Sequence, residues 1–179
     1  MPTYHHGDLR TALLAAASKL IEKEGLVGLS VREAARRAGV SHNAPYRHFP
    51  DREALLAALA AGGFAELGKA LEGHSGRELG EAYVSFALER PQRFRLMFGR
   101  HFPLERYPQI RAQAQASVGT LQKAFAGLGD EANSAAAAAW SLVHGLAHLL
   151  LDGHFENNQA FVKKVLGAVR FAVGAQRSA

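Results

Sequence analysis

The sequence predicts an all-α protein, and three observations support that prediction. Apolar residues recur at the three-to-four-residue spacing of an amphipathic helix through most of the 179 residues. No segment alternates apolar and polar residues as a half-buried strand does. Glycine, proline and helix-capping residues divide the chain at intervals that suit short helices. We therefore expect about nine helices and no sheet.

The first helix is expected over residues 8–24. Its apolar stripe is formed by Leu9, Leu13, Ala16 and Leu20. Gly25 and Gly28 follow directly, and glycine readily adopts the left-handed conformation that ends many helices.

Two short helices joined by a tight turn are expected next. Ser30 and Glu33 have the spacing of a capping box, in which the serine hydroxyl accepts an amide and the glutamate reaches back to the cap. Gly39 stands where the first of these helices must end. Ser41 can cap the second, expected over residues 42–48. This spacing is typical of a helix-turn-helix, whose second helix enters the major groove of DNA.

Longer helices are expected in the rest of the chain. One begins at Asp51, a good N-cap, and extends to about Glu72, with Gly62 and Gly63 placed to bend it. The remaining five are expected over residues 75–89, 91–98, about 110–125, 130–151, and from Asn157 or Asn158 onward.

A run after the second short helix carries a family resemblance. A Tyr-x-His-Phe sequence at residues 46–49 is followed by a charged helix start at residues 50–53 and by Leu55-Leu56. This pattern resembles the TetR family of one-component transcriptional repressors, and the resemblance extends from Tyr4 to about Leu59. It implies a three-helix DNA-binding domain at residues 1–55 and a helical ligand-binding and dimerisation domain at residues 56–179.

The C-terminal half resembles the family over a shorter motif. Trp140, His144 and Gly145 resemble the Trp-His-Gly signature of one group of TetR C-terminal domains. The resemblance implies a homodimer, double-stranded operator DNA as a partner, a small-molecule effector, no cofactor and no enzymatic activity.

Candidate DNA-binding residues gather in and around the helix-turn-helix. His42 and Asn43 occupy the exposed first turn of the expected recognition helix, where side chains can reach base edges. Tyr46 and His48 suit phosphate contacts, whereas Arg47 fits either a DNA-facing or a solvated position. By resemblance, Arg32 matches a base-contacting position and Arg52 a phosphate-contacting position. The full candidate set is Arg32, Ser41, His42, Asn43, Tyr46, Arg47, His48 and Arg52.

Pro45 departs from the family pattern, in which an apolar leucine is common at this position. A proline removes one backbone hydrogen bond and crowds a carbonyl. We expect its ring to fill the apolar slot and the recognition helix to be slightly distorted.

Composition narrows the function classes. The net charge of +5 favours an anionic partner, and DNA is the commonest choice. The chain has no cysteine, which excludes disulfides and cysteine metal sites and fits a cytoplasmic protein. We expect no apolar run to be long enough to span a membrane, and the N-terminus lacks an apolar signal segment. A second basic cluster is not explained by DNA binding: Arg90, Arg93, Arg95, Arg100, Arg106 and Arg111.

The C-terminal half carries two further patterns. The last two helices are apolar on more than one side, which predicts burial against a second copy of the chain. Large apolar and aromatic residues there are the core of the fold, or collectively the lining of a small-molecule pocket. The candidate ligand-binding residues are Tyr83, Phe86, Phe94, Met97, Phe98, Phe102, Phe125, Trp140 and His144.

Two alternatives to a ligand-responsive regulator remain open. His144, His148 and Asp152 follow one ridge of a helix, so a small helical enzyme or metal-binding bundle is an alternative, although a structural role is favoured and no metal is expected. The other alternative is a DNA-binding protein without an effector, whose C-terminal half only dimerises. No phosphate-binding loop, His-Glu-x-x-His helix, nucleophile elbow or other catalytic arrangement is present.

Overall fold

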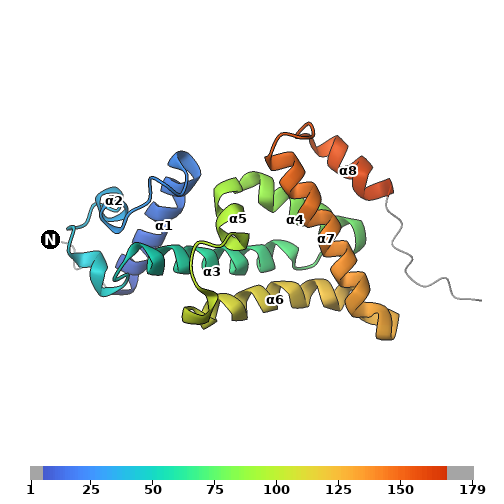
Figure 1. The fold of residues 1–179 in the computed structure, drawn as a ribbon, viewed down its shortest axis with the longest axis horizontal. Coiled ribbons are helices and arrows are strands. Elements are labelled where there is room, and N and C mark those ends of the chain that lie inside the picture. Colours follow the sequence, from blue (N-terminus) through green and yellow to red (C-terminus); the bar gives the residue numbers. More distant parts are fainter. Residues whose placement is uncertain (1–5, 169–179) are drawn as a thin grey trace, which may run out of the picture. The chain divides into compact units, whose positions relative to one another are not determined.

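The computed structural model describes residues 6–168, and helices make up its regular structure with no strand in that range (Figure 1). The prediction of an all-α fold is confirmed. The α-helices are α1 (His6–Glu24), α2 (Val31–Arg37), α3 (Arg52–Leu71), α4 (Gly76–Glu89), α5 (Pro91–Phe98), α6 (Pro108–Ala124), α7 (Ala132–Leu151) and α8 (Gln159–Ala168). Three short 3₁₀ helices accompany them: η1 (Ala44–Arg47), η2 (Leu104–Arg106) and η3 (Ala126–Glu131).

The chain forms two compact units, each built from two separate stretches. The first unit contains residues 6–64 and 90–113 of the described range, and the second contains residues 65–89 and 114–168. Because α3 and α6 are continuous helices, each contributes residues to both units.

The first unit is built around α1. Leu13, Leu20 and Ile21 on this helix are completely buried. The carboxylate of Glu22, on the same helix, accepts the backbone N–H groups of Gln92 and Arg93 at 3.1 and 2.9 Å. Those N–H groups belong to the first turn of α5, which has no partners for them within the helix. Glu22 therefore caps α5 and fixes it to α1.

Gly63 marks a close approach between α3 and α5. A Cβ at this position would lie 2.6 Å from Sδ and 2.9 Å from Cγ of Met97. A Cβ at neighbouring Gly62 would meet only Nη1 of Arg93, at 3.9 Å. The helix runs without interruption through both glycines, so at Gly63 the missing side chain makes room for Met97.

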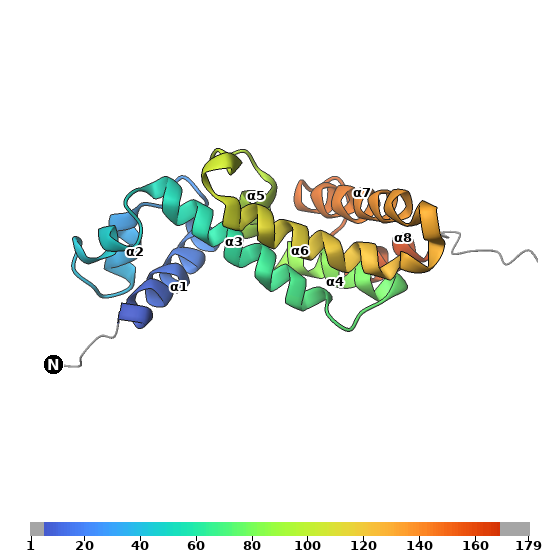
Figure 2. The same ribbon diagram turned by 90° about the horizontal axis from the view of Figure 1, so that it is seen from below.

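The second unit packs α4 against α7 and α8. Figure 2 shows these helices from below, in a view where α6 partly covers α4 and α8. Gly80 on α4 is a point of tight contact, because a Cβ there would lie 3.2 Å from Val143 on α7 and 3.3 Å from Leu166 on α8. The side chain of Asn158 accepts the backbone N–H of Phe161 at 2.7 Å. Asn158 thus caps α8, as one of the two alternatives predicted.

The expectation that no segment could span a membrane was wrong on length and composition alone. Arg52–Leu71 and Ala126–Leu151 each contain an 18-residue window with a mean hydropathy of 1.4. Half of the window is buried in the first case and 33% in the second. Buried core helices of soluble proteins have the same composition, so these helices are weak evidence for a membrane.

Candidate functional site

The helix-turn-helix begins at the predicted cap. The hydroxyl of Ser30 accepts the backbone N–H of Glu33 at 3.0 Å. The reciprocal half of the predicted capping box is absent, because the Glu33 carboxylate instead accepts hydrogen bonds from Arg36 at 2.6 and 2.8 Å and from Arg37 at 2.8 Å. These hydrogen bonds, that from Arg36 foremost, lower the pKa of Glu33 to about 2. Arg37 also bonds Glu24 on α1 at 2.5 Å, so it ties α2 to α1.

The turn after α2 has the conformation that the sequence predicts. Gly39 has a φ of +69°, in the left-handed region where residues with a side chain are strained. Its N–H donates to Arg36 O at 3.2 Å, and the N–H of Val40 donates to Ala35 O at 3.1 Å. These bonds occupy carbonyls at the end of α2 and turn the chain towards residue 41.

The predicted recognition helix over residues 42–48 was wrong in type and length. Only Ala44–Arg47 are helical, and they form the 3₁₀ helix η1. Pro45 has no N–H to donate, and it disfavours the α conformation at the residue before it. The Ser41 side chain makes no cap, and Asn43 takes the N-cap position without a side-chain bond. The ring of Pro45 is buried, so it fills the apolar slot as expected.

The candidate DNA-binding residues lie in or beside η1, in the first turn of α2 and in the first turn of α3. All of them are exposed except His48, which is half-buried. Tyr46 is 40% exposed, so its ring and hydroxyl are accessible at the surface.

Arg52 differs from the others because its guanidinium is bound within the chain. Its Nε donates to Leu29 O at 2.8 Å and its Nη2 to Leu26 O at 2.5 Å. It thereby holds the loop that leads to Ser30 and α2. Sequence reasoning missed this role, since the partners are carbonyl groups more than twenty residues away in the chain.

The candidate ligand-binding residues divide between the two units. Phe94, Met97, Phe98 and Phe102 lie in the first unit, where the ring centroids of Phe94 and Phe98 are 4.9 Å apart. The candidates in the second unit are Tyr83, Phe86, Phe125, Trp140 and His144.

Three of the second-unit residues form a hydrogen-bonded chain. Nε1 of Trp140, which can only donate, bonds the Tyr83 hydroxyl at 3.1 Å, and that hydroxyl lies 2.9 Å from Nδ1 of His144. Burial raises the pKa of Tyr83 above its ordinary value, so the phenol keeps its proton and can donate it to His144. Burial, and secondarily the neighbouring His148, lowers the pKa of His144. A neutral His144 with an accepting Nδ1 fits this arrangement.

A small groove in the second unit involves other residues. It has a volume of about 230 Å³ and lies between α4 and the start of α8. It is lined by Glu81, Val84, Ser85, Leu88, Asn157, Gln159 and Val162, and none of the nine predicted ligand-binding residues is among them.

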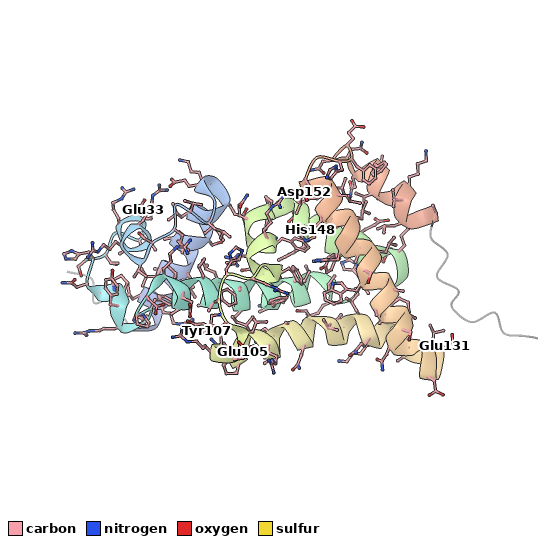
Figure 3. The ribbon with its side chains drawn as sticks, in the orientation of Figure 1. Glu33, Glu105, Tyr107, Glu131, His148 and Asp152 are labelled. Carbon is pink, nitrogen blue, oxygen red and sulfur yellow. The ribbon has the colours of Figure 1, made fainter. Side chains whose placement is uncertain are left out.

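The alternative of a metal-binding ridge finds no support. Within residues 6–168 no group of three or more histidine or acidic side chains is placed to hold a metal ion. Nδ1 of His144 faces Tyr83, and the rings of His144 and His148 meet edge to face with centroids 4.7 Å apart. Figure 3 labels His148 and, at the end of α7, Asp152. The helical spacing that suggested ligands reflects ring packing for the two histidines.

Comparison with known proteins identifies two regions. Residues 13–59 match the family model for bacterial regulatory proteins of the tetR family, and residues 77–169 match the model for a tetracyclin repressor-like C-terminal domain. The second region contains Trp140, His144 and Gly145. No match was found among curated proteins.

Solved structures resemble most of the chain. A protein of unknown function from Rhodococcus sp. RHA1 is 38% identical, with a TM-score of 0.78 over 94% of each chain. A TetR family regulator from Vibrio parahaemolyticus is 19% identical over 89% of this chain and 97% of its own, with a TM-score of 0.63. The multidrug binding protein EbrR, complexed with imidazole, is 22% identical over 88% of this chain and 92% of its own, with a TM-score of 0.60. The last two likenesses concern the fold alone.

Proposed function

Because this chain belongs to the TetR family of bacterial regulatory proteins, we propose that it is a ligand-responsive repressor that binds a palindromic operator as a homodimer. Family membership makes it a DNA-binding transcriptional regulator without enzymatic activity. The repressor role, the palindromic operator, the release by a small molecule and the individual residue roles belong to the proposal. So does the division of labour between residues 1–55, which bind DNA, and residues 56–179, which bind the effector and dimerise.

The observation that carries the proposal is the exposed surface around η1. His42, Asn43, Tyr46 and Arg47 are exposed next to a buried Pro45, so the segment has an anchored side and a solvent side. Asparagine pairs bidentately with adenine, histidine can donate or accept, and arginine and tyrosine suit phosphates. We assign base reading to His42 and Asn43 and backbone contacts to the other two.

The surface of α7 supports a homodimer. This helix contains no Asp, Glu, Lys or Arg, and only 33% of the apolar stretch within residues 126–151 is buried. Leu149 is 40% exposed, and a Cβ added at Gly145 would meet nothing within 4 Å. A smooth apolar helix face with space for close approach suits packing against its symmetry mate. The two copies of the recognition segment, residues 42–47, would then be related by a two-fold axis and would read a palindrome.

The effector is proposed to be a mainly apolar or aromatic small molecule. In support, the hydrogen-bonded side chains of Tyr83, Trp140 and His144 place a few polar atoms in the second unit, whose buried residues are mainly apolar. Small-molecule sites commonly combine a few polar groups with an apolar lining. EbrR, which has the same fold, is described as a multidrug binding protein. A ligand that binds better to a conformation with low DNA affinity must weaken DNA binding by the same coupling factor.

Selection of bound duplexes from a random DNA pool tests the DNA-binding part of the proposal. We expect a recovered sequence with dyad symmetry and half-sites about one helical turn apart, or a multiple of that distance. Recovery of asymmetric sites, or no enrichment at low salt, would contradict it.

A screen of small aromatic compounds tests the effector. A true effector raises the melting temperature by mass action and also releases the selected duplex. Compounds that stabilise the protein without releasing DNA would favour the alternative in which the C-terminal half only dimerises.

A further inference from the structure

The first turn of α3 is a junction between three segments of the first unit. Asp51 caps the helix, since its Oδ1 accepts the N–H of Ala54 at 2.7 Å. Arg52 holds the loop before α2 through the carbonyls described above. Glu53 accepts two hydrogen bonds of 2.9 Å at the same Oε1, one from Nη1 of Arg106 and one from the hydroxyl of Tyr107.

The segment whose side chains bind Glu53 lies far from the helix-turn-helix in sequence, and buried residues around it hold it in place. It comprises η2 and Tyr107, which Figure 3 labels at the start of α6. The Tyr107 ring meets the ring of Phe102 edge to face, with centroids 5.8 Å apart, and Phe102 is buried. The Tyr107 carbonyl accepts the N–H of buried Ile110 at 2.9 Å. A displaced Glu53 would therefore pull against a packed segment.

Two parts of the helix-turn-helix are connected to the first turn of α3: η1 precedes it in the chain, and the loop before α2 is bound by Arg52. The last residue of η1 lies only five positions before Arg52, and the carbonyl of Pro45 accepts the N–H of Phe49 at 2.9 Å. The carbonyl groups that Arg52 binds lie just ahead of Ser30, the N-cap of α2. Movement of this one turn would thus displace both η1 and α2.

We propose that Arg106 and Tyr107 are positioning residues for DNA binding, which act by holding Glu53 and with it the first turn of α3. This role accounts for one arginine of the second basic cluster without a direct DNA contact. The side chain of Arg106 is 63% exposed, so its pairing with Glu53 contributes little to stability by itself. Its effect is on the placement of the recognition segment.

The direction in which one substitution changes the DNA affinity distinguishes a positioning role from a purely electrostatic one. Glu53→Gln removes a negative charge from a DNA-binding unit, and charge alone would strengthen binding to the DNA polyanion. Positioning predicts the opposite, because a neutral amide oxygen binds the Arg106 guanidinium less strongly than a carboxylate does.

The experiment compares the full-length variants Glu53→Gln, Arg106→Gln and Tyr107→Phe with Glu105→Gln as the control. Glu105 is exposed in the turn that contains Arg106 and Tyr107. Its replacement therefore removes one negative charge from that turn. The probes are the tightest duplex selected from a random pool and a scrambled duplex of equal length. We expect roughly 3- to 10-fold weaker binding of the selected duplex for the three test variants, an unchanged salt dependence, and no loss for the control.

Several outcomes would overturn the proposal. One is tighter binding by Glu53→Gln together with a salt slope reduced by about 0.9 for Arg106→Gln, which would make Arg106 a phosphate contact. Another is a lowered melting temperature with unchanged DNA affinity, which would make the turn structural only. If single variants unfold, the double variant Glu53→Arg with Arg106→Glu must recover folding and affinity. Failure of the wild-type chain to select any duplex would instead refute the proposed function.

Discussion

Replacing Gly63 with alanine is the perturbation whose outcome the structure defines most sharply. The new Cβ would lie 2.6 Å from Sδ and 2.9 Å from Cγ of Met97, and 3.1 Å from Cδ of Arg93. Met97 and Arg93 are both about 5% exposed, so neither side chain can move into solvent without disturbing the core. Gly62→Ala is the matched control, because its Cβ would meet nothing closer than 3.9 Å.

Both substitutions gain stability from the higher helix propensity of alanine, but only Gly63→Ala forces a methyl group into a packed core. Alanine in place of glycine in the middle of a helix stabilises by about 0.5–1 kcal/mol. An extra methyl group forced into a packed core costs about 1–3 kcal/mol. Gly62→Ala should therefore raise the free energy of unfolding, and Gly63→Ala should lower it or leave it near the wild-type value. A difference of about 2 kcal/mol corresponds to about 4–8 °C in melting temperature for a chain of this size.

Thermal and urea unfolding at one protein concentration measure this difference. A shortened partner gives a further check: Met97→Ala should cost less in the Gly63→Ala background than in the wild type, because it removes the clash. Equal stability of the two glycine variants would refute the close approach of α3 and α5 at this position.

Four further outcomes follow from the structure. Leu149→Glu should yield a folded monomer in sedimentation, whereas a dimer that survives this charge would place the interface elsewhere. The wild-type melting temperature should fall as the pH drops below about 6.5, because the histidine of the unfolded chain takes up a proton there while the lowered pKa of folded His144 opposes protonation. The variant His144→Asn should lose the part of this pH dependence that His144 contributes. A pH profile that is unchanged in the variant would contradict this role of His144. His42→Ala and Asn43→Ala should each weaken binding of the selected duplex by about 1–3 kcal/mol, and an equal loss on random DNA would argue against base reading. Arg52→Ala should weaken binding to all sequences and also lower the melting temperature, whereas unchanged stability would leave a direct phosphate contact as its role.

Local chemistry explains what could be anticipated in the helix-turn-helix. The cap at Ser30, the left-handed Gly39 and the cap at Asp51 depend on residues within a few positions, so spacing alone predicts them. Pro45 also acts locally, and the segment that contains it is a 3₁₀ helix where the sequence predicted a longer recognition helix. Its effect reaches beyond its own position, because a proline also restricts the backbone of the residue before it.

The candidate ligand-binding residues show where sequence patterns stop being informative. Aromatic and apolar residues at helical spacing predict burial, and most of the nine are buried. Spacing cannot assign them to partners, and they divide between the two units. Likewise, the ridge of His144 and His148 satisfied the periodicity of a metal site, while Tyr83, 61 residues away, supplies the actual partner of His144.

Periodicity, caps and turn residues act over a few positions, so the helical fold class, most helix boundaries and the family can be predicted from the chain alone. The role of each long-range contact depends on the tertiary structure. It gave Arg52 carbonyl partners more than twenty residues away, joined Glu53 to Arg106 and Tyr107, and assigned Gly63 to a close approach rather than a bend. A hydrogen-bond donor or a missing side chain has no preferred partner until the fold brings one within a few ångströms.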